Sequence, residues 1–171
     1  MSTGAHLEIE RKYLIRYPDL SLLSSLPGRQ VWEITQTYLN DGEGGQTRRV
    51  RRVICDGETR YFRTFKRRVS ALSADEDEAE LTPEEYKAHL HQADRSRVPV
   101  IKTRYRIPHR GHVVEIDVFP FWKDRALMEI ELASEDESAD IPDYVQIIRE
   151  VSGEKAYKNR QLARRVPMED I

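Results

Sequence analysis

Charged and apolar side chains alternate along much of the chain, with a period of two residues. In the first such segment, Glu8, Glu10 and Lys12 alternate with Ile9 and Tyr13. Successive side chains of a β-strand point to opposite faces of a sheet, so the three charged groups would share one face. The same alternation of charge recurs in Arg49 and Arg51, Lys102, Arg104 and Arg106, Glu115 and Asp117, and Glu129 and Glu131. The pattern predicts a sheet with one charged face.

So many charged strand faces favour a closed barrel over an open sheet. A half-exposed antiparallel sheet shows its charged face to water, and any one of these segments alone is more typical of that arrangement. Closure of the sheet would instead direct the charged faces into a polar lumen and leave the apolar faces outside, covered by helices. A lumen of this kind predicts a charged ligand.

The expected strands are joined by hairpins. Turn residues separate neighbouring strands at Asn40-Asp41-Gly42, Asp56-Gly57 and Arg110-Gly111. The predicted fold class is therefore α+β, mainly antiparallel β, with an eight-stranded closed tunnel or barrel, a charged interior and flanking helices. We expect the strands at residues 6–15, 31–40, 46–55, 60–68, 75–81, 100–108, 112–119 and 126–133.

The clearest helix signal follows the fifth expected strand. Thr82, Pro83 and Glu85 form a capping box with proline at the first helical position, and they predict a helix from Thr82 to about residue 93. Tyr86 and Leu90 lie four residues apart, which places one apolar stripe against the barrel exterior. Shorter helices are expected near residues 20–26 and 157–165. Residues 134–143 are strongly acidic and predict a surface loop.

Length and composition limit the classes of protein. The 171 residues predict a single domain over residues 1–171. The 28 basic and 30 acidic residues leave a net charge of −2, which predicts no general attraction to nucleic acid or to a membrane. Cys55 is the single cysteine, so an internal disulfide is excluded and a reducing compartment is expected. The sequence has no apolar run of about 20 residues and no signal-peptide pattern at residues 1–6, which predicts a cytoplasmic protein.

The charged faces have the donor types of a metal and phosphate site. Carboxylates at alternate strand positions hold hard cations such as Mg²⁺ or Mn²⁺, and Glu8 with Glu10 and Glu129 with Glu131 are the best pairs. Basic groups at alternate positions suit phosphate oxygens, and the candidates are Arg49, Arg51, Lys66, Lys102 and Arg104. For Glu115 and Asp117, a solvated face and a lumen position carry equal weight. Together the two sets predict a site for a linear triphosphate.

The ordered motifs resemble those of a known family. The segment Glu8-Ile-Glu-Arg-Lys12 is similar to the Glu-x-Glu-x-Lys signature of the CYTH superfamily, the triphosphate tunnel metalloenzymes. The resemblance covers residues 6–163 and continues in order through Gln36-Thr-Tyr-Leu39, Arg49-Val-Arg51, Thr64-Phe-Lys66, Glu76-Asp-Glu78, Lys102-Thr-Arg104, Glu115-Ile-Asp117, Glu129-Ile-Glu131 and Glu150-Val-Ser-Gly-Glu-Lys-Ala-Tyr-Lys-Asn159.

This resemblance implies a tunnel that binds a triphosphate and one or two divalent metal ions, Mg²⁺ or Mn²⁺. It implies metal ligation by Glu8, Glu10, Glu129 and Glu131. It implies phosphate binding by Lys12, Arg49, Arg51, Lys66, Lys102 and Arg104, joined by Lys155. The catalytic residues expected on this basis are Glu10, Lys12 and Glu78, with attack on the terminal phosphorus by a metal-bound water and no covalent intermediate.

Three details of the site stay open at this stage. Glu76, Glu78 and Glu80 occupy alternate positions of one strand and therefore share one parity, meaning that their side chains point to the same face. Each could orient water, bind metal or balance lysines. The run Arg48 to Arg52 leaves the register ambiguous, and Val50 favours an inward-facing Arg49 and Arg51. The family often has an arginine just before the middle acidic pair, where this chain has Ala74. Its contact would be missing or supplied by Arg63, Arg67 or Arg68.

Several functions remain compatible with the sequence. Hydrolysis of inorganic tripolyphosphate is the leading hypothesis. Hydrolysis of a nucleoside or thiamine triphosphate would need an aromatic rim, for which Tyr61, Phe62, Tyr105 and Trp122 are candidates. Cyclisation of ATP to cyclic AMP, or binding of polyphosphate without turnover, are further alternatives. The expected partner is the small-molecule triphosphate, with no nucleic acid or membrane, and a homodimer is left open. His89, His91, His109 and His112 are expected at the surface, and Trp32 and Trp122 in packing roles.

Overall fold

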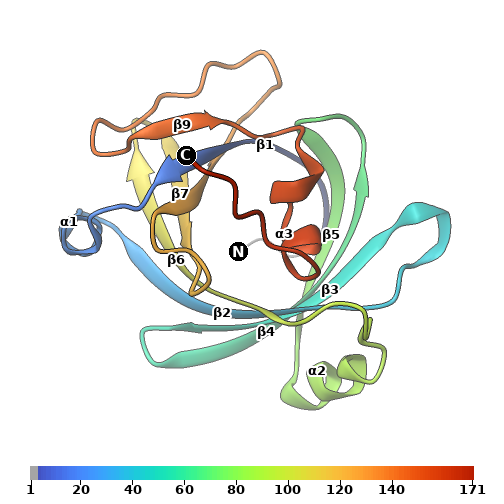
Figure 1. Cartoon of the computed structure of the whole chain (residues 1–171). Coiled ribbons are helices and arrows are strands. Elements are labelled where there is room, and N and C mark those ends of the chain that lie inside the picture. Colours follow the sequence, from blue (N-terminus) through green and yellow to red (C-terminus); the bar gives the residue numbers. More distant parts are fainter. Residues whose placement is uncertain (1–3) are drawn as a thin grey trace.

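The computed structural model describes residues 4–171. Nine strands form one antiparallel sheet in the order β5-β4-β3-β2-β6-β7-β8-β1-β9, and a further pairing of β1 with β5 closes eight of them into a barrel (Figure 1). This confirms the predicted closed barrel. The strands are β1 (Gly4–Arg16), β2 (Gln30–Tyr38), β3 (Thr47–Cys55), β4 (Glu58–Arg68), β5 (Ser73–Leu81), β6 (Val100–His109), β7 (His112–Val118), β8 (Arg125–Glu131) and β9 (Ile147–Glu150).

The long strand β1 closes the barrel by changing partners along its length. Residues 4–9 pair with β5, whereas residues 10–16 pair with β8 on the other edge. Over Tyr13 to Ile15 the strand also pairs with β9. The eight predicted strands all exist, each within two residues of its expected ends. Strand β9 was not predicted, because Ile147 and Ile148 break the alternation that identified the others.

Two of the predicted turns have the backbone that a tight hairpin requires. Asp56 and Gly57 connect β3 to β4 with φ of 51° and 76°, and Arg110 and Gly111 connect β6 to β7 with φ of 46° and 79°. Positive φ at both central residues matches the right-handed twist of the flanking strands. In each hairpin the residues on either side of the turn face each other, as in the pair His109 and His112. The two turns therefore set the register of the β3–β4 and β6–β7 pairs.

The helices are shorter than expected. Helix α2 (Pro83–Leu90) has the predicted capping box, in which Thr82 Oγ1 accepts a hydrogen bond from the Glu85 amide at 3.1 Å. It ends before Ala93 because that residue forms a β-bridge with Leu39. Helix α1 spans Leu20–Ser25. The expected helix at 157–165 is replaced by two single turns, η2 (Lys155–Tyr157) and α3 (Asn159–Leu162), separated by Lys158 in an extended conformation.

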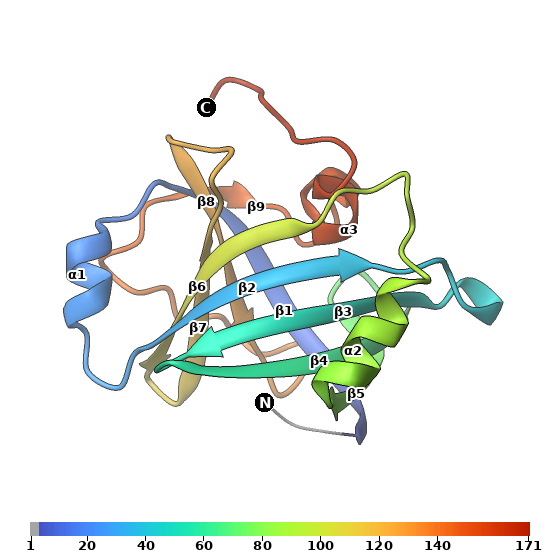
Figure 2. The same ribbon diagram turned by 90° about the horizontal axis from the view of Figure 1, so that it is seen from below.

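The outer faces of β1, β6, β7 and β8 carry the largest apolar core. Tyr13, Ile116 and Met128 belong to it, together with Leu23 of α1. Helices supply only part of the cover that the sequence predicted. The rest is the segment 132–145, whose Ile141 packs on the same cluster, so the acidic stretch 134–143 is more than a surface loop. Figure 2 shows α1 on one side of the barrel and α2 on another.

His109 and His112 hold the same segment to the barrel through ion-pair contacts with Asp140 and Glu137. The side chains of His109 and His112 are only 19% and 20% exposed. These two histidines are therefore partly buried. His91 is exposed, as expected, and His89 is half-buried on α2.

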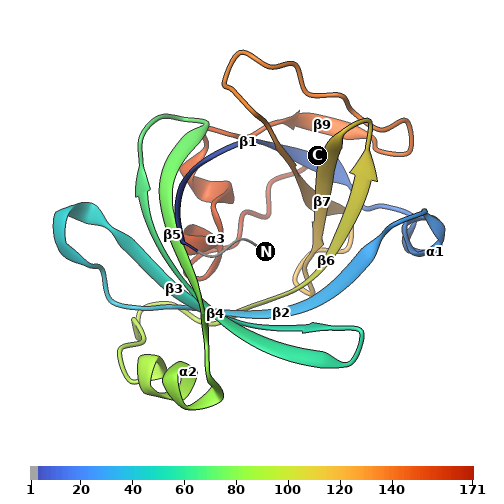
Figure 3. The ribbon, with the colours of Figure 1, turned by 180° about the vertical axis from the view of Figure 1, so that it is seen from behind.

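A second core lies inside the barrel and closes one end of it. Leu14 and Leu127, which have the parity of the lumen-facing charges, pack with Tyr157 and Leu162 from the C-terminal segment. Figures 1 and 2 show this segment, with α3, across one end of the barrel, and Figure 3 shows the opposite end. We call residues 151–163 the plug. Trp122 also packs in this core, which confirms its predicted packing role.

A third apolar cluster bounds the lumen on another side. It consists of Trp32, Ile34, Val53 and Phe62, which also have lumen-facing parity on β2, β3 and β4. The predicted packing role of Trp32 is confirmed. The polar part of the lumen is thus confined between apolar clusters. Among residues 4–171, no helix is long and apolar enough to cross a membrane.

Candidate functional site

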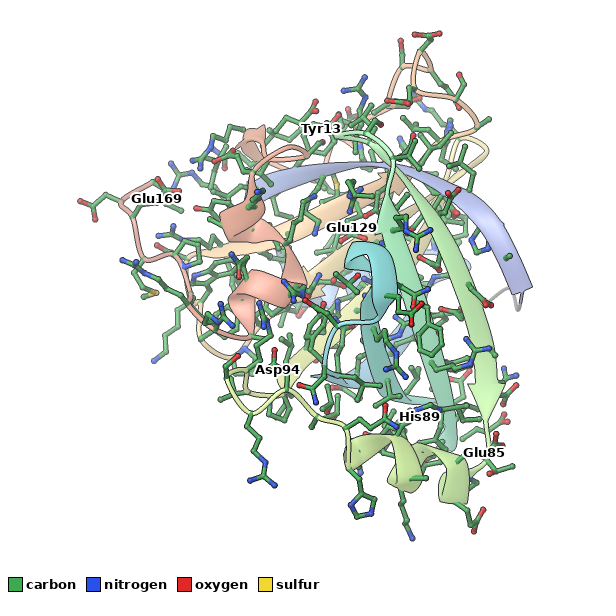
Figure 4. The ribbon with its side chains drawn as sticks, turned by 90° about the vertical axis from the view of Figure 1, so that its right-hand side faces the viewer. Tyr13, Glu85, His89, Asp94, Glu129 and Glu169 are labelled. Carbon is green, nitrogen blue, oxygen red and sulfur yellow. The ribbon has the colours of Figure 1, made fainter. Side chains whose placement is uncertain are left out.

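A cavity of about 410 Å³ occupies the polar part of the lumen. It lies next to the plug, to the turn η1 (Glu43–Gly45) and to the end of β4. Figure 4 views the molecule from the side of η1 and α3, with Glu129 labelled in the interior. Most of the predicted site residues line this cavity: Glu8, Glu10, Lys12, Arg49, Lys66, Arg104, Glu129 and Lys155.

Strand register explains why these residues meet. Lys12 lies directly opposite Glu129, and Glu10 lies opposite Glu131 in the β1–β8 pair. Glu129 in turn faces Glu115 across the β7–β8 pair. Directly paired residues in antiparallel strands point to the same side of the sheet. A residue that faces the lumen on one strand therefore has a lumen-facing partner on the next strand around the barrel. The alternation in the sequence and the register of the closed barrel together gather these charges in one lumen.

The carboxylates of the cavity repel one another. Burial raises the pKa of Glu10 well above its usual range, and the neighbouring Glu129 and Glu8 raise it further. Burial also opposes ionisation of Glu129, but Lys12 and Arg104 outweigh this and lower its pKa. The ammonium of Lys12 lies 3.2 Å from a Glu129 oxygen. A hydrogen bond from Glu10 also helps to lower the pKa of Glu129.

The donor set of the cavity suits a hard divalent cation. Within the described part of the chain, no three histidine, cysteine or acidic side chains are already arranged as a metal centre. Glu8, Glu10 and Glu129 nevertheless line one cavity and offer only oxygen donors, which Mg²⁺ and Mn²⁺ prefer. A divalent cation between them would relieve the repulsion that raises the pKa of Glu10. These three residues fit the implied metal.

Glu131 has a more peripheral position than predicted. It shares the parity of Glu129, but its side chain is exposed at the end of β8 and it does not line the cavity. Partial burial raises its pKa, and the charges of Glu115 and Glu8 add to the effect. Glu131 is therefore near the other carboxylates without facing the same space.

Lys66 and Arg49 of the cavity lie among carboxylates. Lys66 Nζ lies 2.8 Å from Glu8 Oε2 and 3.6 Å from Glu76 Oε2. Burial lowers the pKa of Arg49, but Tyr38 and nearby carboxylates, including Glu76, outweigh it and keep the pKa above its ordinary value. Lys66 and Arg49 are thus positioned and charged before any ligand binds, which favours binding of an anion.

Arg104 is fixed more firmly than the other cavity cations. It donates Nε and Nη2 to the two oxygens of Asp117 at 2.7 and 2.9 Å, and Nη1 to Glu115 at 3.2 Å. Asp117 is only 2% exposed, so the solvated-face interpretation is wrong for this residue. Glu115 lines the cavity.

Lys102 faces inward but does not line the cavity. Its side chain is 1% exposed, and its Nζ contacts Asp117 at 2.9 Å and donates to Asn159 Oδ1 of the plug at 3.2 Å. Burial lowers its pKa to about 8. The structure therefore does not support the predicted direct contact of Lys102 with phosphate. Its neighbours indicate that it supports Arg104 through the shared Asp117.

Arg51 and Glu78 also lie in the interior outside the cavity lining. Arg51 Nη2 donates to Glu78 Oε2 at 3.1 Å, and Thr64 Oγ1 donates to the same oxygen at 3.2 Å. Thr64 lines the cavity. Arg51, predicted to bind phosphate, and Glu78, predicted to be catalytic, are thus connected to the cavity lining only through Thr64. The inward register chosen for Arg49 and Arg51 is confirmed.

The other two glutamates of β5, Glu76 and Glu80, differ in environment. Glu76 is buried beside Lys66, and burial followed by a hydrogen bond with Glu8 raises its pKa to about 7. Glu80 is exposed and pairs with Arg60, with Nη2 and Oε2 2.6 Å apart. Of the three, Glu76 is therefore in contact with a cavity cation, whereas Glu80 lies outside the lumen.

Some basic residues of the cavity carry no assignment from the sequence alone: Arg48, Lys158 and Arg160. Lys158 belongs to the plug, where only Lys155 was predicted. Arg68, one of the three candidates for the missing arginine contact, lines the cavity and lies directly opposite Ala74 in the β4–β5 pair. Arg68 thus supplies a cation next to the position where the family arginine is absent. Arg63 and Arg67, the other candidates, contact Asp77 and the Glu43 carbonyl instead.

The aromatic residues considered for a rim are all used elsewhere. Tyr61 stacks against Tyr86 of α2, with ring centroids 4.7 Å apart. Phe62, Tyr105 and Trp122 belong to the three apolar clusters described above. Tyr38 is the single aromatic residue in the described lining of the cavity. Its hydroxyl accepts a hydrogen bond from Gln36 at 2.7 Å.

Comparison with known structures shows the same fold. The inorganic triphosphatase NE1496 is 29% identical, and the match covers 94% of this chain and 99% of that one, with a TM-score of 0.55. PH1819 from Pyrococcus horikoshii OT3 is 16% identical over 75% of this chain and 80% of its own, with a TM-score of 0.58. A candidate adenylate cyclase, bh2851 from Bacillus halodurans, is 17% identical over 78% and 84%, with a TM-score of 0.53.

The class of fold follows from these similarities together with the barrel. The chain has a CYTH-like tunnel fold, a closed eight-stranded antiparallel barrel with one extra strand and three α-helices. No protein-family model matches the sequence, and no curated protein matches it.

Proposed function

We propose that this protein is a metal-dependent triphosphatase that hydrolyses a linear triphosphate, and that its substrate is inorganic tripolyphosphate. The observation that carries the proposal is one cavity in which Glu8, Glu10 and Glu129 face Lys12, Lys66 and other cations. The similarity to the inorganic triphosphatase NE1496 over nearly the whole of both chains supports it.

Each group has a distinct task in this proposal. Glu8, Glu10 and Glu129 would hold Mg²⁺ or Mn²⁺, which when bound lowers the pKa of water and neutralises phosphate charge. Lys12, Lys66, Arg49 and Arg104 bind the phosphate oxygens and stabilise charge on the leaving group. Lys155 adds a cation from the plug. Arg51, Glu78 and Lys102 position the lining residues through the contacts described above.

The lining of the cavity favours an inorganic substrate over an organic one. A nucleobase or thiazole needs an apolar or aromatic surface, and among the described lining residues only Tyr38 is aromatic. The hydroxyl of Tyr38 is engaged by Gln36. Hydrolysis of nucleoside or thiamine triphosphates and cyclisation of ATP are therefore the alternatives with less support.

A substrate panel tests the proposal. Tripolyphosphate, ATP and thiamine triphosphate would be incubated with Mg²⁺ or Mn²⁺, and release of phosphate, pyrophosphate and cyclic AMP measured. We expect phosphate release fastest from tripolyphosphate, and its loss when a chelator removes the metal, because the cavity carboxylates then lack their counter-ion. Pyrophosphate with cyclic AMP from ATP would instead show a cyclase. No product from any substrate would contradict the triphosphatase function.

Replacing Lys12 should weaken substrate binding. Lys12→Ala removes a charge-assisted contact to phosphate, and such contacts contribute about 1.5–3 kcal/mol. We therefore expect KM for tripolyphosphate to rise by about 10- to 100-fold. The matched control is Lys87→Ala, which removes an exposed lysine of α2 remote from the cavity lining. Steady-state kinetics on both variants measures the effect. An unchanged KM for Lys12→Ala would remove Lys12 from the substrate site.

A further inference from the structure

The cavity has more basic residues than its carboxylates hold. Lys12 and Lys66 are held by Glu129 and Glu8. Lys158 is different: its Nζ donates to the Ser152 carbonyl at 3.3 Å, and in the described chain it forms no ion pair. It is half-buried where the plug meets the cavity.

The nearest charges to Lys158 are mostly positive. Burial lowers its pKa to about 8, and the charges of Arg68, Lys12 and Lys66 lower it further, against the opposing charge of Glu10. All four basic groups line the same cavity. An anion placed there would offset the repulsion between these cations.

Arg68 extends the row of cations toward the opening. It follows Lys66 by two residues on β4, so both share the lumen-facing side, and Arg68 lies about 7 Å further along the strand. Its side chain is exposed, and over residues 4–171 it has no ion-pair partner. Lys155 is also exposed at the cavity and has no carboxylate contact in the same range.

We propose that Lys158 and Arg68, beside Lys155, form an outer anion subsite that binds the continuing end of a linear inorganic polyphosphate longer than three phosphates. The inner cations Lys12 and Lys66 hold the first three phosphates, and the outer group holds the next. The inference rests on the proposed function for the identity of the inner ligand. Every unit of a linear polyphosphate carries negative charge and accepts hydrogen bonds from basic groups. Such a chain therefore suits a row of cations that runs from the carboxylate-lined interior to the opening.

Binding without turnover tests this subsite. Titration calorimetry with chelator present would compare linear tripolyphosphate and linear tetrapolyphosphate on the full chain. The wild type should bind tetrapolyphosphate about tenfold more tightly, as expected for one additional charge-assisted contact. The double substitution Lys158→Gln with Arg68→Gln should abolish this preference. Lys158→Arg with Arg68→Lys, which keeps both charges, should retain it.

A matched control removes the same charge from elsewhere. Lys87→Gln with Arg95→Gln changes two exposed residues outside the cavity lining and should leave the preference intact. A wild type without preference for the longer chain, or a Lys158→Gln with Arg68→Gln variant that keeps it, would overturn the inference. The calorimetry measures binding and no turnover, whereas the substrate panel measures hydrolysis. Failure of the subsite and failure of the proposed function can therefore be told apart.

Discussion

Glu129→Gln is expected to reduce metal-dependent phosphate release from tripolyphosphate by at least about a hundredfold. Glutamine keeps the size of the side chain but removes the charge that contacts Lys12 at 3.2 Å and Arg104 at 3.7 Å. It also removes one oxygen anion from the set that would hold the metal. The loss should appear mainly in kcat, with a higher metal concentration needed for half-maximal rate.

The fold should largely survive this change. Lys12 and Arg104 keep other acidic neighbours, since Glu10 lies beside Lys12 and Asp117 binds Arg104 through two hydrogen bonds. Thermal unfolding followed by circular dichroism would verify this. Glu84→Gln, on the exposed face of α2, is the matched control for loss of one carboxylate. Phosphate release by Glu129→Gln at the wild-type rate would exclude Glu129 from the site.

Glu131→Gln distinguishes the two acidic residues of β8. The sequence gives them equal standing because they share parity, whereas the structure buries Glu129 and exposes Glu131. We expect the rate loss for Glu131→Gln to be at least tenfold smaller than for Glu129→Gln, since Glu131 does not line the cavity. Steady-state kinetics of the two variants under identical metal concentrations measures the difference. Equal losses would return Glu131 to the metal set.

The barrel could be predicted because its signal is local and repeated. Each strand alternates with period two, and turns such as Asp56-Gly57 require residues that tolerate positive φ. Parity correctly placed Glu8, Glu10 and Lys12 in the lumen. These features need no information about distant parts of the chain.

Depth along the lumen could not be predicted from the same pattern. The alternation predicts which face of the sheet a side chain points to. It does not predict whether that side chain lines the cavity. Lys102 and Arg51 face inward, yet Lys102 is covered by Asn159 and Asp117, and Arg51 is bound to Glu78. Those contacts depend on strand stagger and on the plug, which the sequence pattern does not reveal.

The plug itself has no periodic signal. The turns η2 and α3 are three and four residues long, too short for a helical repeat to appear in the sequence. Lys158 lies between them, so its position in the cavity follows from tertiary packing of Tyr157 and Leu162. A sequence-based helix over 157–165 would have distributed these side chains differently.

Asp117→Ala is expected to destabilise the protein by about 3–5 kcal/mol, because it leaves two buried cations without their shared partner. Asp117 contacts Lys102 at 2.9 Å and binds Arg104 through two hydrogen bonds, and all three side chains are at most 9% exposed. Glu115 and Glu129 still contact Arg104, whereas among residues 4–171 Lys102 keeps only the neutral Asn159 oxygen within hydrogen-bond distance. The largest part of the cost therefore falls on Lys102.

A second substitution can separate two contributions to this loss of stability: the uncompensated charge of Lys102 and the loss of packing around Asp117. Lys102→Met in the Asp117→Ala background removes the uncompensated ammonium and should recover part of the lost stability, measured by urea unfolding. The matched comparison is Glu80→Ala, which breaks the exposed pair with Arg60 and should cost at most about 1 kcal/mol. If Asp117→Ala proved no more destabilising than Glu80→Ala, the buried cations would not depend on Asp117. A large cost that Lys102→Met relieves would show that this interior carboxylate stabilises the charged wall of the lumen before any substrate binds.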